Sequence, residues 1–146
     1  MTQEELKKVI LEYLEKNRRM TLATASENIP WAATVMFAYD TNLNFYFISN
    51  PETRKIKNLE ANPQISCAIN EFKNKAGSTM GIQIGGMAEQ LDKTKHKKEL
   101  EIFRKRFDWA DDYLHDHELF KIKPSKIIYL DDEKFGPGGK QELNLN

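Results

Sequence analysis

The residues between positions 49 and 55 have the composition of an anion-binding site. Asparagine caps helices and proline is favoured at the first helical position, so Asn50 and Pro51 predict a helix start. A helix start exposes unpaired N–H groups and the positive end of the helix dipole, and both attract an anion. The donors and cations gathered here are Ser49, Asn50, Thr53, Arg54 and Lys55. From spacing alone, an ordinary capped helix with exposed basic residues is favoured over an anion-binding site.

Residues 31–39 form a second segment of interest, because their side chains alternate in size. The odd positions are mostly large, whereas the even positions carry Ala32, Thr34, Met36 and Ala38. Successive side chains of a strand point to opposite faces, so one face is expected to fill a core and the other to be shallow. A shallow face is either exposed to solvent or lets a flat ligand or another subunit approach the backbone.

Other constellations carry weaker signals. His115 and His117 flank Asp116 in an acidic stretch, but a second pair of spaced ligands is lacking, so no metal site is expected. Glutamates interrupt the basic residues of 95–106, which indicates a solvated helix face. The glycine-rich stretch 136–140 lacks the spacing of a phosphate-binding loop. The one cysteine, Cys67, lies in a largely apolar run, which predicts a buried thiol.

Composition limits the class of protein. The 146 residues include 22 basic and 22 acidic ones, so the net charge of zero argues against a general nucleic-acid binder. A chain of this length predicts one domain over residues 1–146. The longest mostly apolar stretch, residues 31–39, is far shorter than the roughly 20 residues that span a membrane. The amino-terminal residues lack the pattern of a signal peptide, and a cytoplasmic location is expected.

These candidate sites need elements to position them, and the apolar periodicity predicts mostly strands. An amphipathic helix is expected at 3–18, a short helix after Asn50 and a third helix at 93–107. The expected strands are 19–25, 31–39, 44–49, 64–71, 79–91, 118–123 and 126–131, joined mainly by short links typical of antiparallel neighbours. The pair Gly85-Gly86 predicts a bulge, and Pro124-Ser125 predicts a break between strands. Residues 108–118 are expected to be irregular.

The order of these segments resembles a known family. Met20–Thr24, Ala33–Phe37 and Phe45–Ser49, followed by Thr53–Leu59 and Asn62-Pro63, are similar to the pyridoxamine 5′-phosphate oxidase-like FMN-binding split-barrel family, in its small and uncharacterised branch. The resemblance implies a mainly β (α+β) fold, a small antiparallel split β-barrel with flanking helices. It also implies a homodimer with FMN at the subunit boundary. By this resemblance, Thr34, Val35 and Met36 lie along the isoalloxazine ring, and Ser49, Asn50, Thr53, Arg54 and Lys55 bind the phosphate.

The chain departs from the namesake oxidase of that family. Residues 32–37 contain no basic residue, and Gln83 stands where the oxidase has an arginine. The late arginine and histidine motif is also missing from 131–136, which argues against vitamin B6 oxidation. We expect an FMN-dependent oxidoreductase acting on a small substrate or redox partner, with no side chain yet assigned as acid or base. The alternatives are a non-catalytic module that binds or senses flavin, haem or another planar ligand, and a ligand-free structural dimer.

Overall fold

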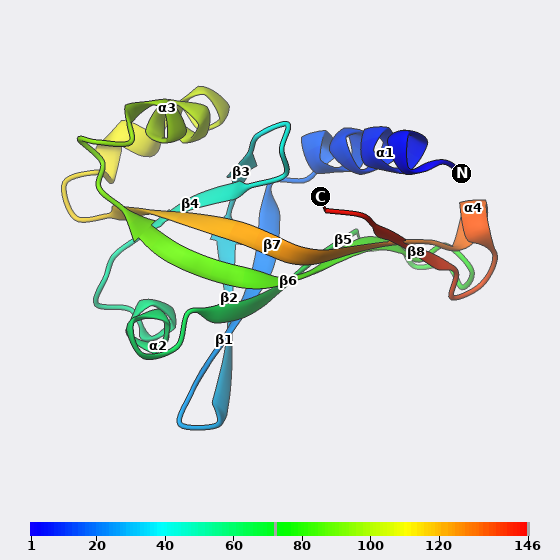
Figure 1. The fold of residues 1–146 in the computed structure, drawn as a ribbon, viewed down its shortest axis with the longest axis horizontal. Coiled ribbons are helices and arrows are strands. Elements are labelled where there is room, and N and C mark those ends of the chain that lie inside the picture. The colour runs from blue at the N-terminus through cyan, green and yellow to red at the C-terminus, as the bar shows by residue number, and fades with distance from the viewer. Residues whose placement is uncertain (72, 146) are drawn as a thin grey trace.

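The computed structural model describes residues 1–71 and 73–145, and more of them lie in strands than in helices (Figure 1). The strands are β1 Arg19–Ser26, β2 Ile29–Met36, β3 Ala38–Tyr39, β4 Phe45–Ser49, β5 Gln64–Asn70, β6 Met80–Leu91, β7 Glu118–Asp131 and β8 Lys140–Leu143. The helices are α1 Gln3–Lys16, α2 Arg54–Ala61, α3 Lys97–Arg106, α4 Asp132–Phe135 and a 3₁₀ turn, η1, at Ala110–Asp112. None of the helices in the described residues is long and apolar enough to cross a membrane.

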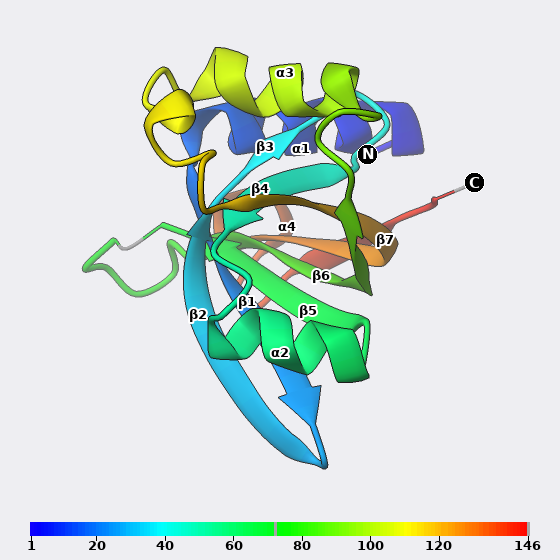
Figure 2. The ribbon, with the colours of Figure 1, turned by 90° about the vertical axis from the view of Figure 1, so that its left-hand side faces the viewer.

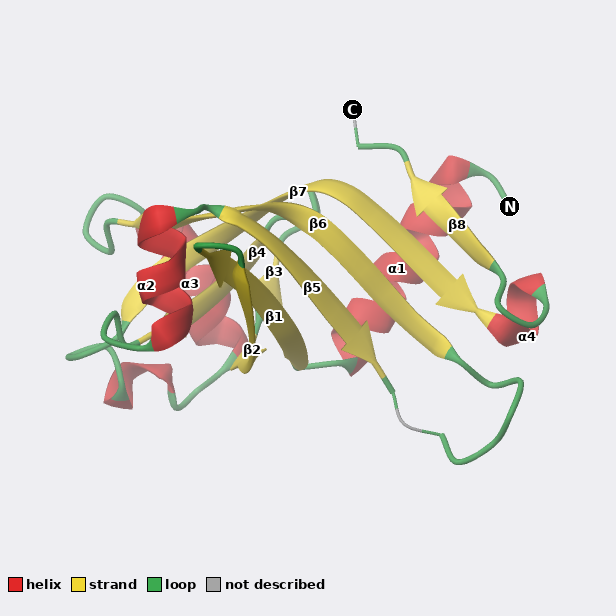
Figure 3. Cartoon of the chain, turned by 90° about the horizontal axis from the view of Figure 1, so that it is seen from below, coloured by secondary structure: helices red, strands yellow, loops and turns green. Residues whose placement is uncertain are grey.

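All strands belong to one antiparallel sheet that curls on itself. The strands follow the order β2-β1-β5-β6-β7-β4-β3, and β8 pairs with the second half of β7. The two edge strands, β2 and β3, are separated in the chain by Phe37 alone, so the sheet must bend until its edges approach each other. Figure 3 shows the resulting curvature. The predicted split-barrel fold is confirmed.

The core fills the inside of the curled sheet with large apolar side chains. Phe37, Phe45 and Phe47 are fully buried, and the ring of Phe47 stacks on that of Phe120 with 5.1 Å between the ring centroids. Figure 2 shows α1 and α3 together on one side of the barrel and α2 on the other. The barrel and these helices hold the segments that build the candidate site.

Residues 31–39 do not form one continuous strand as predicted. β2 ends at Met36, and Phe37 donates its N–H to the Arg18 carbonyl at 3.0 Å while its ring enters the core. The break allows the chain to pass from one edge of the sheet to the other. The size alternation correctly placed Val35 and Phe37 inside, but Trp31 is 43% exposed because β2 extends beyond the core at that end.

The predicted break at Pro124-Ser125 is wrong, because β7 runs through both residues. Gly85 pairs with Lys126 and Gly86 pairs with Pro124, so Ser125 is the extra residue of a bulge. Proline is tolerated there because a bulge interrupts the ladder of hydrogen bonds. The bulge predicted at the glycine pair is confirmed.

Two helices begin later than predicted. Asp92 accepts hydrogen bonds from the N–H and the hydroxyl of Thr94, at 2.8 and 2.6 Å, and α3 starts only at Lys97. The corresponding change in α2 affects the candidate site and is described with it. In both places an aspartate or asparagine side chain bonds the backbone two residues on, which replaces the first helical turn.

Candidate functional site

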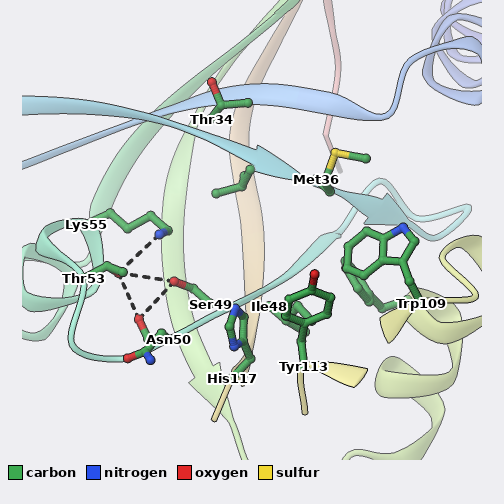
Figure 4. Close-up of a pocket in the computed structure, with 12 residues that line it drawn as sticks. Thr34, Met36, Ile48, Ser49, Asn50, Thr53, Lys55, Trp109, Tyr113 and His117 are labelled. Carbon is green, nitrogen blue, oxygen red and sulfur yellow. Dashed lines mark hydrogen bonds between the residues drawn. The ribbon is translucent and has the colours of Figure 1, made fainter. Parts of the chain in front are cut away.

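A cavity of about 480 Å³ opens between the end of β2, the end of β4, the start of α2 and the segment from α3 to β7 (Figure 4). It is lined by Thr34, Val35, Met36, Ile48, Ser49, Asn50, Thr53, Lys55, Phe103, Trp109, Tyr113 and His117. The lining therefore includes every predicted cofactor-binding residue except Arg54. Residues from the two predicted binding segments, distant along the chain, face one space.

Hydroxyl groups and one ammonium group converge at the α2 end of the cavity. The Ser49 Oγ lies 3.3 Å from the Thr53 Oγ1, and the Thr53 hydroxyl donates to the Asn50 carbonyl at 2.9 Å. The Lys55 Nζ donates to the Thr53 Oγ1 at 3.2 Å. Figure 4 shows the side chains of Ser49, Thr53 and Lys55 pointing toward one another, with the Asn50 carbonyl oxygen beside them. We call Ser49, Asn50, Thr53 and Lys55 the polar cluster.

The polar cluster lies at a helix start that no side chain caps within the described residues. Thr53 is the N-cap residue of α2, but its hydroxyl is directed to Asn50 instead of the first helical N–H groups. Burial lowers the pKa of the Lys55 ammonium, because removing a cation from water disfavours the charged form. An anion bound here would meet both the helix dipole and this desolvated cation.

The predicted N-cap at Asn50 is wrong by three residues. The side-chain oxygen of Asn50 accepts the N–H of Glu52 at 2.8 Å, so residues 50–52 form a turn and α2 begins at Arg54. This shift brings Thr53 to the helix start, beside Ser49. The side-chain amide of Asn50 is thus used in its own turn. Its backbone carbonyl accepts hydrogen bonds from the hydroxyl groups of Ser49 and Thr53 in the polar cluster.

Arg54 does not line the cavity. Its guanidinium lies over the ring of Trp31, 4.3 Å from the ring centroid, in a cation–π contact between α2 and β2. The structure thus separates the two adjacent cations: Lys55 faces the cavity, whereas Arg54 joins the helix to the strand. A role for Arg54 in cofactor binding stays a prediction.

An aromatic wall, Phe103, Trp109, Tyr113 and His117, closes the opposite side of the cavity. Each ring meets the next, with centroid distances of 6.0, 5.6 and 5.4 Å along the series. None of these four residues was among the predicted site residues, and the last three lie in 108–118, which was expected to be an irregular acidic segment. Their spacing of four residues was the available signal, and the turns of this segment place them side by side.

The chemistry open to this site follows from its two sides. The polar cluster suits a phosphate or carboxylate, and the aromatic wall with the β2 face suits a flat ligand.

His115, Asp116 and His117 do not form a metal centre: among the described residues no group of three or more His, Cys, Asp or Glu side chains is arranged to hold an ion.

Comparison with known proteins identifies relatives of the whole fold. A family model described as pyridoxamine 5′-phosphate oxidase matches residues 6–131. UPF0306 protein PM1958 of Pasteurella multocida is 24% identical over 101 residues, which cover 68% of each chain. HutZ, a haem storage protein of Vibrio cholerae, superposes with a TM-score of 0.72 and 20% identity, covering 82% of this chain and 91% of HutZ. A FAD-binding protein of Mesorhizobium loti gives 0.63 and 23%, covering 80% and 88%.

Proposed function

The chain belongs to the pyridoxamine 5′-phosphate oxidase family, and from this membership we propose that it is an FMN-binding flavoprotein that exchanges electrons with a small substrate or redox partner. The FAD-binding relative supports a flavin in this fold. A cytoplasmic location is part of the proposal, since the one cysteine, Cys67, is buried and free.

The observation that carries the proposal is the half-buried Lys55 beside two hydroxyl groups at an uncapped helix start. Ammonium, hydroxyl and backbone N–H groups are the donors that hold phosphates in proteins. Ser49 is 3% exposed, and its hydroxyl lies 3.3 Å from that of Thr53. These residues fit the phosphate of FMN and would bind it as a dianion.

The rest of the cavity fits a flat ring system. Thr34 and Met36 face the cavity from β2, and the aromatic wall lies across from them (Figure 4). Short and intermediate side chains on β2 let a ring lie close to the backbone, and the wall would exclude water from its other surface. Bound FMN supplies the electron-transfer chemistry, while the protein supplies position and electrostatics.

A spectrum of the purified protein tests the proposal. We expect flavin absorption at about 450 nm, restored when FMN is added to protein stripped of ligand. Riboflavin, which lacks only the phosphate, is expected to bind at least about 100-fold more weakly, because charge-assisted hydrogen bonds are lost. Equal affinity for the two flavins would contradict the phosphate assignment, and no uptake of FMN would contradict the cofactor.

NADH or NADPH then separates an enzyme from a non-catalytic flavin-binding module. We expect bound FMN to be bleached by one of these donors and to regain its colour with an electron acceptor. A flavin that neither donor reduces would favour the binding module instead.

Haem is the second candidate ligand, and His117 favours it. The Nδ1 of His117 is engaged by Asp116 at 2.6 Å, so the Nε2 remains to face the cavity, and histidines that bind metals are commonly held in this way. The HutZ relative stores haem. An absorption band at about 400 nm after adding haemin, lost in His117→Ala, would favour haem over flavin.

A homodimer is the remaining part of the proposal. The outer face of β1, β5, β6 and β7 carries a hollow of about 410 Å³ lined largely by short side chains, among them Thr21, Ala23 and Ala68. Thr21 pairs with Thr34, so this hollow and the candidate site lie on the same face of the sheet. A second copy packed there would cover the cavity beside β2.

Sedimentation equilibrium tests the dimer, with an expected mass twice that of the chain. Ala68→Glu places a charge in the exposed hollow and is expected to shift the protein toward monomer and to lower its FMN content. Thr41→Glu adds the same charge to an exposed turn and is the matched control. The interface would be contradicted if the natural protein were monomeric, or if the two variants had the same mass in solution and the same FMN content.

A further inference from the structure

Asn58 is a polar residue on the buried side of α2. It is 7% exposed and lies in the sequence between Ile56 and Leu59, the apolar side chains that α2 buries. Its side-chain Nδ2 donates to the Oγ1 of Thr24 on β1 at 3.1 Å, and Thr24 is 3% exposed. A hydrogen bond between neutral buried groups contributes little net stability, and two apolar side chains of the same shape can replace it at little cost. Stability alone therefore does not account for a polar pair at this position.

Asn58 belongs to a row of side chains that face the β1–β2 hairpin, which packs against α2 (Figure 2). Arg54, Asn58 and Asn62 are spaced four residues apart, so they lie on one side of the helix. Arg54 lies over Trp31 of β2, and the Asn62 amide donates to a backbone carbonyl of β1 at 3.1 Å. Thr24 and Trp31 are direct partners in the β1–β2 ladder. The row therefore attaches α2 to adjoining positions of one hairpin.

The direction of this row determines which cation faces the cavity. Successive residues of an α-helix point about 100° apart, so Arg54 and Lys55 cannot face the same space. Because Arg54 and Asn58 are turned to the hairpin, Lys55 is turned to the cavity, where its Nζ donates to the Thr53 Oγ1 at 3.2 Å. A rotation of α2 about its axis would move Lys55 away from the polar cluster.

The other contacts of α2 restrain this rotation less. Ile56 and Leu59 make apolar contacts, and hydrophobic burial has no preferred direction. Arg54 and Trp31 are both exposed, and the turn at residues 50–52 ties only the start of the helix to β4. The buried hydrogen bond to β1 differs from these contacts, because a hydrogen bond weakens steeply when its angle departs from linear. It is therefore the contact best suited to hold α2 in one rotation.

We propose that Asn58 is a positioning residue of the phosphate site: by bonding Thr24, it holds α2 in the rotation that turns Lys55, and not Arg54, to the polar cluster. This role rests on the proposed contact between the polar cluster and the phosphate of FMN. Asn58 does not line the cavity, so it acts through Lys55. The preference for FMN over riboflavin is then expected to depend on a hydrogen bond that lies outside the cavity.

Two substitutions of Thr24 test this role with little change in packing. Thr24→Val keeps the shape and removes the acceptor, whereas Thr24→Ser keeps the acceptor and removes a methyl group. Fluorescence titration of ligand-free protein gives the affinities for FMN and riboflavin. We expect their ratio, at least about 100 in the natural protein, to fall below about 10 in Thr24→Val and to stay near its natural value in Thr24→Ser. A merely structural role would weaken the binding of both flavins alike and leave the ratio unchanged.

The contribution of Lys55 to binding provides a second readout. Lys55→Ala is expected to weaken FMN binding by about 10-fold or more in the natural background. In Thr24→Val/Asn58→Leu it is expected to cost less than about threefold, because two residues that act together are not additive. The apolar pair is expected to leave the midpoint of urea denaturation near its natural value. Tyr129→Phe is the matched control, since it removes another buried side-chain hydrogen bond, to Asp131 at 3.1 Å, outside the cavity, and should leave the flavin ratio unchanged.

The positioning role is overturned if Thr24→Val keeps the natural flavin ratio, or if Thr24→Ser or Tyr129→Phe lowers that ratio as much as Thr24→Val does. It is also overturned if Lys55→Ala costs as much in the double variant as in the natural protein. Should the double variant not fold, the two single substitutions of Thr24 decide. A natural protein that binds FMN no more tightly than riboflavin would instead overturn the phosphate contact of the proposed function, and this role with it.

Discussion

Replacing Lys55 with alanine is expected to weaken FMN binding by about 10- to 100-fold, the range expected when a hydrogen bond to a charged group is lost. The ammonium of Lys55 is half-buried, points to the Thr53 hydroxyl and faces the cavity. A desolvated cation contributes more to anion binding than one in water, since the local dielectric is lower. Fluorescence titration of ligand-free protein with FMN measures the change.

Lys57→Ala is the matched control, because Lys57 lies on the same helix, is half exposed and pairs with Glu52 outside the cavity. Its loss is expected to change FMN affinity by less than about threefold, as is usual for exposed charges. Equal losses in both variants would contradict a specific phosphate contact.

The affinity for FMN should also depend on pH in a defined direction. Burial lowers the pKa of Lys55, so the ammonium loses its proton at a lower pH than an exposed lysine. The contribution of the Lys55 ammonium to FMN affinity is therefore present below that lowered pKa and is lost as the pH rises through it. Lys55→Arg should retain the affinity at alkaline pH, because arginine stays protonated.

Replacing Gly86 with alanine is expected to lower the free energy of unfolding by about 2–3 kcal/mol, the upper part of the range for overpacked sites. A Cβ at this position would lie 2.4 Å from the Lys123 carbonyl oxygen and 2.9 Å from the Pro124 Cα. Both atoms belong to the backbone of β7 at the bulge, so neither moves without disturbing the sheet. Urea denaturation measures the loss as a lower midpoint at unchanged slope.

The neighbouring glycine supplies the control. At Gly85 the nearest atom to an added Cβ is the Lys126 Cβ, at 4.0 Å, which is ordinary contact. Gly85→Ala is therefore expected to change the free energy of unfolding by less than about 0.5 kcal/mol, as most open substitutions do. Similar destabilisation by both substitutions would mean that glycine is required at both positions for strand flexibility, and not at Gly86 for the close approach of β7.

Much of the fold was accessible from local patterns. Alternating side chains predicted the buried Val35 and Phe37, and the glycine pair predicted the bulge. Local patterns failed at Pro124, where the partner strand supplies a glycine that accommodates the irregularity. The same limit applies to the helix start near Asn50, because turn and helix compete through hydrogen bonds of similar strength.

The candidate site was likewise predicted in part. The resemblance to a family picked out the polar cluster and the β2 residues, and all of them line one cavity; their contact with a cofactor stays a prediction. The orientation of Arg54 depends on where Trp31 lies, and Trp31 belongs to a different element. The aromatic wall depends on how α3 and η1 pack against the barrel, which spacing within one segment does not reveal.

The topology of the sheet also links ligand binding to cooperative unfolding. The polar cluster begins at Ser49, the last residue of β4, and β4 pairs with β7 next to the edge strand β3. The ring-facing residues lie on β2, at the other edge of the same curled sheet. Any opening of the barrel between these edges separates the two halves of the cavity, so a partly unfolded chain has no complete site. A ligand that requires both halves would stabilise only the native state, by about 2.7 kcal/mol at a free concentration 100 times its Kd. Its presence would make the barrel unfold as one unit.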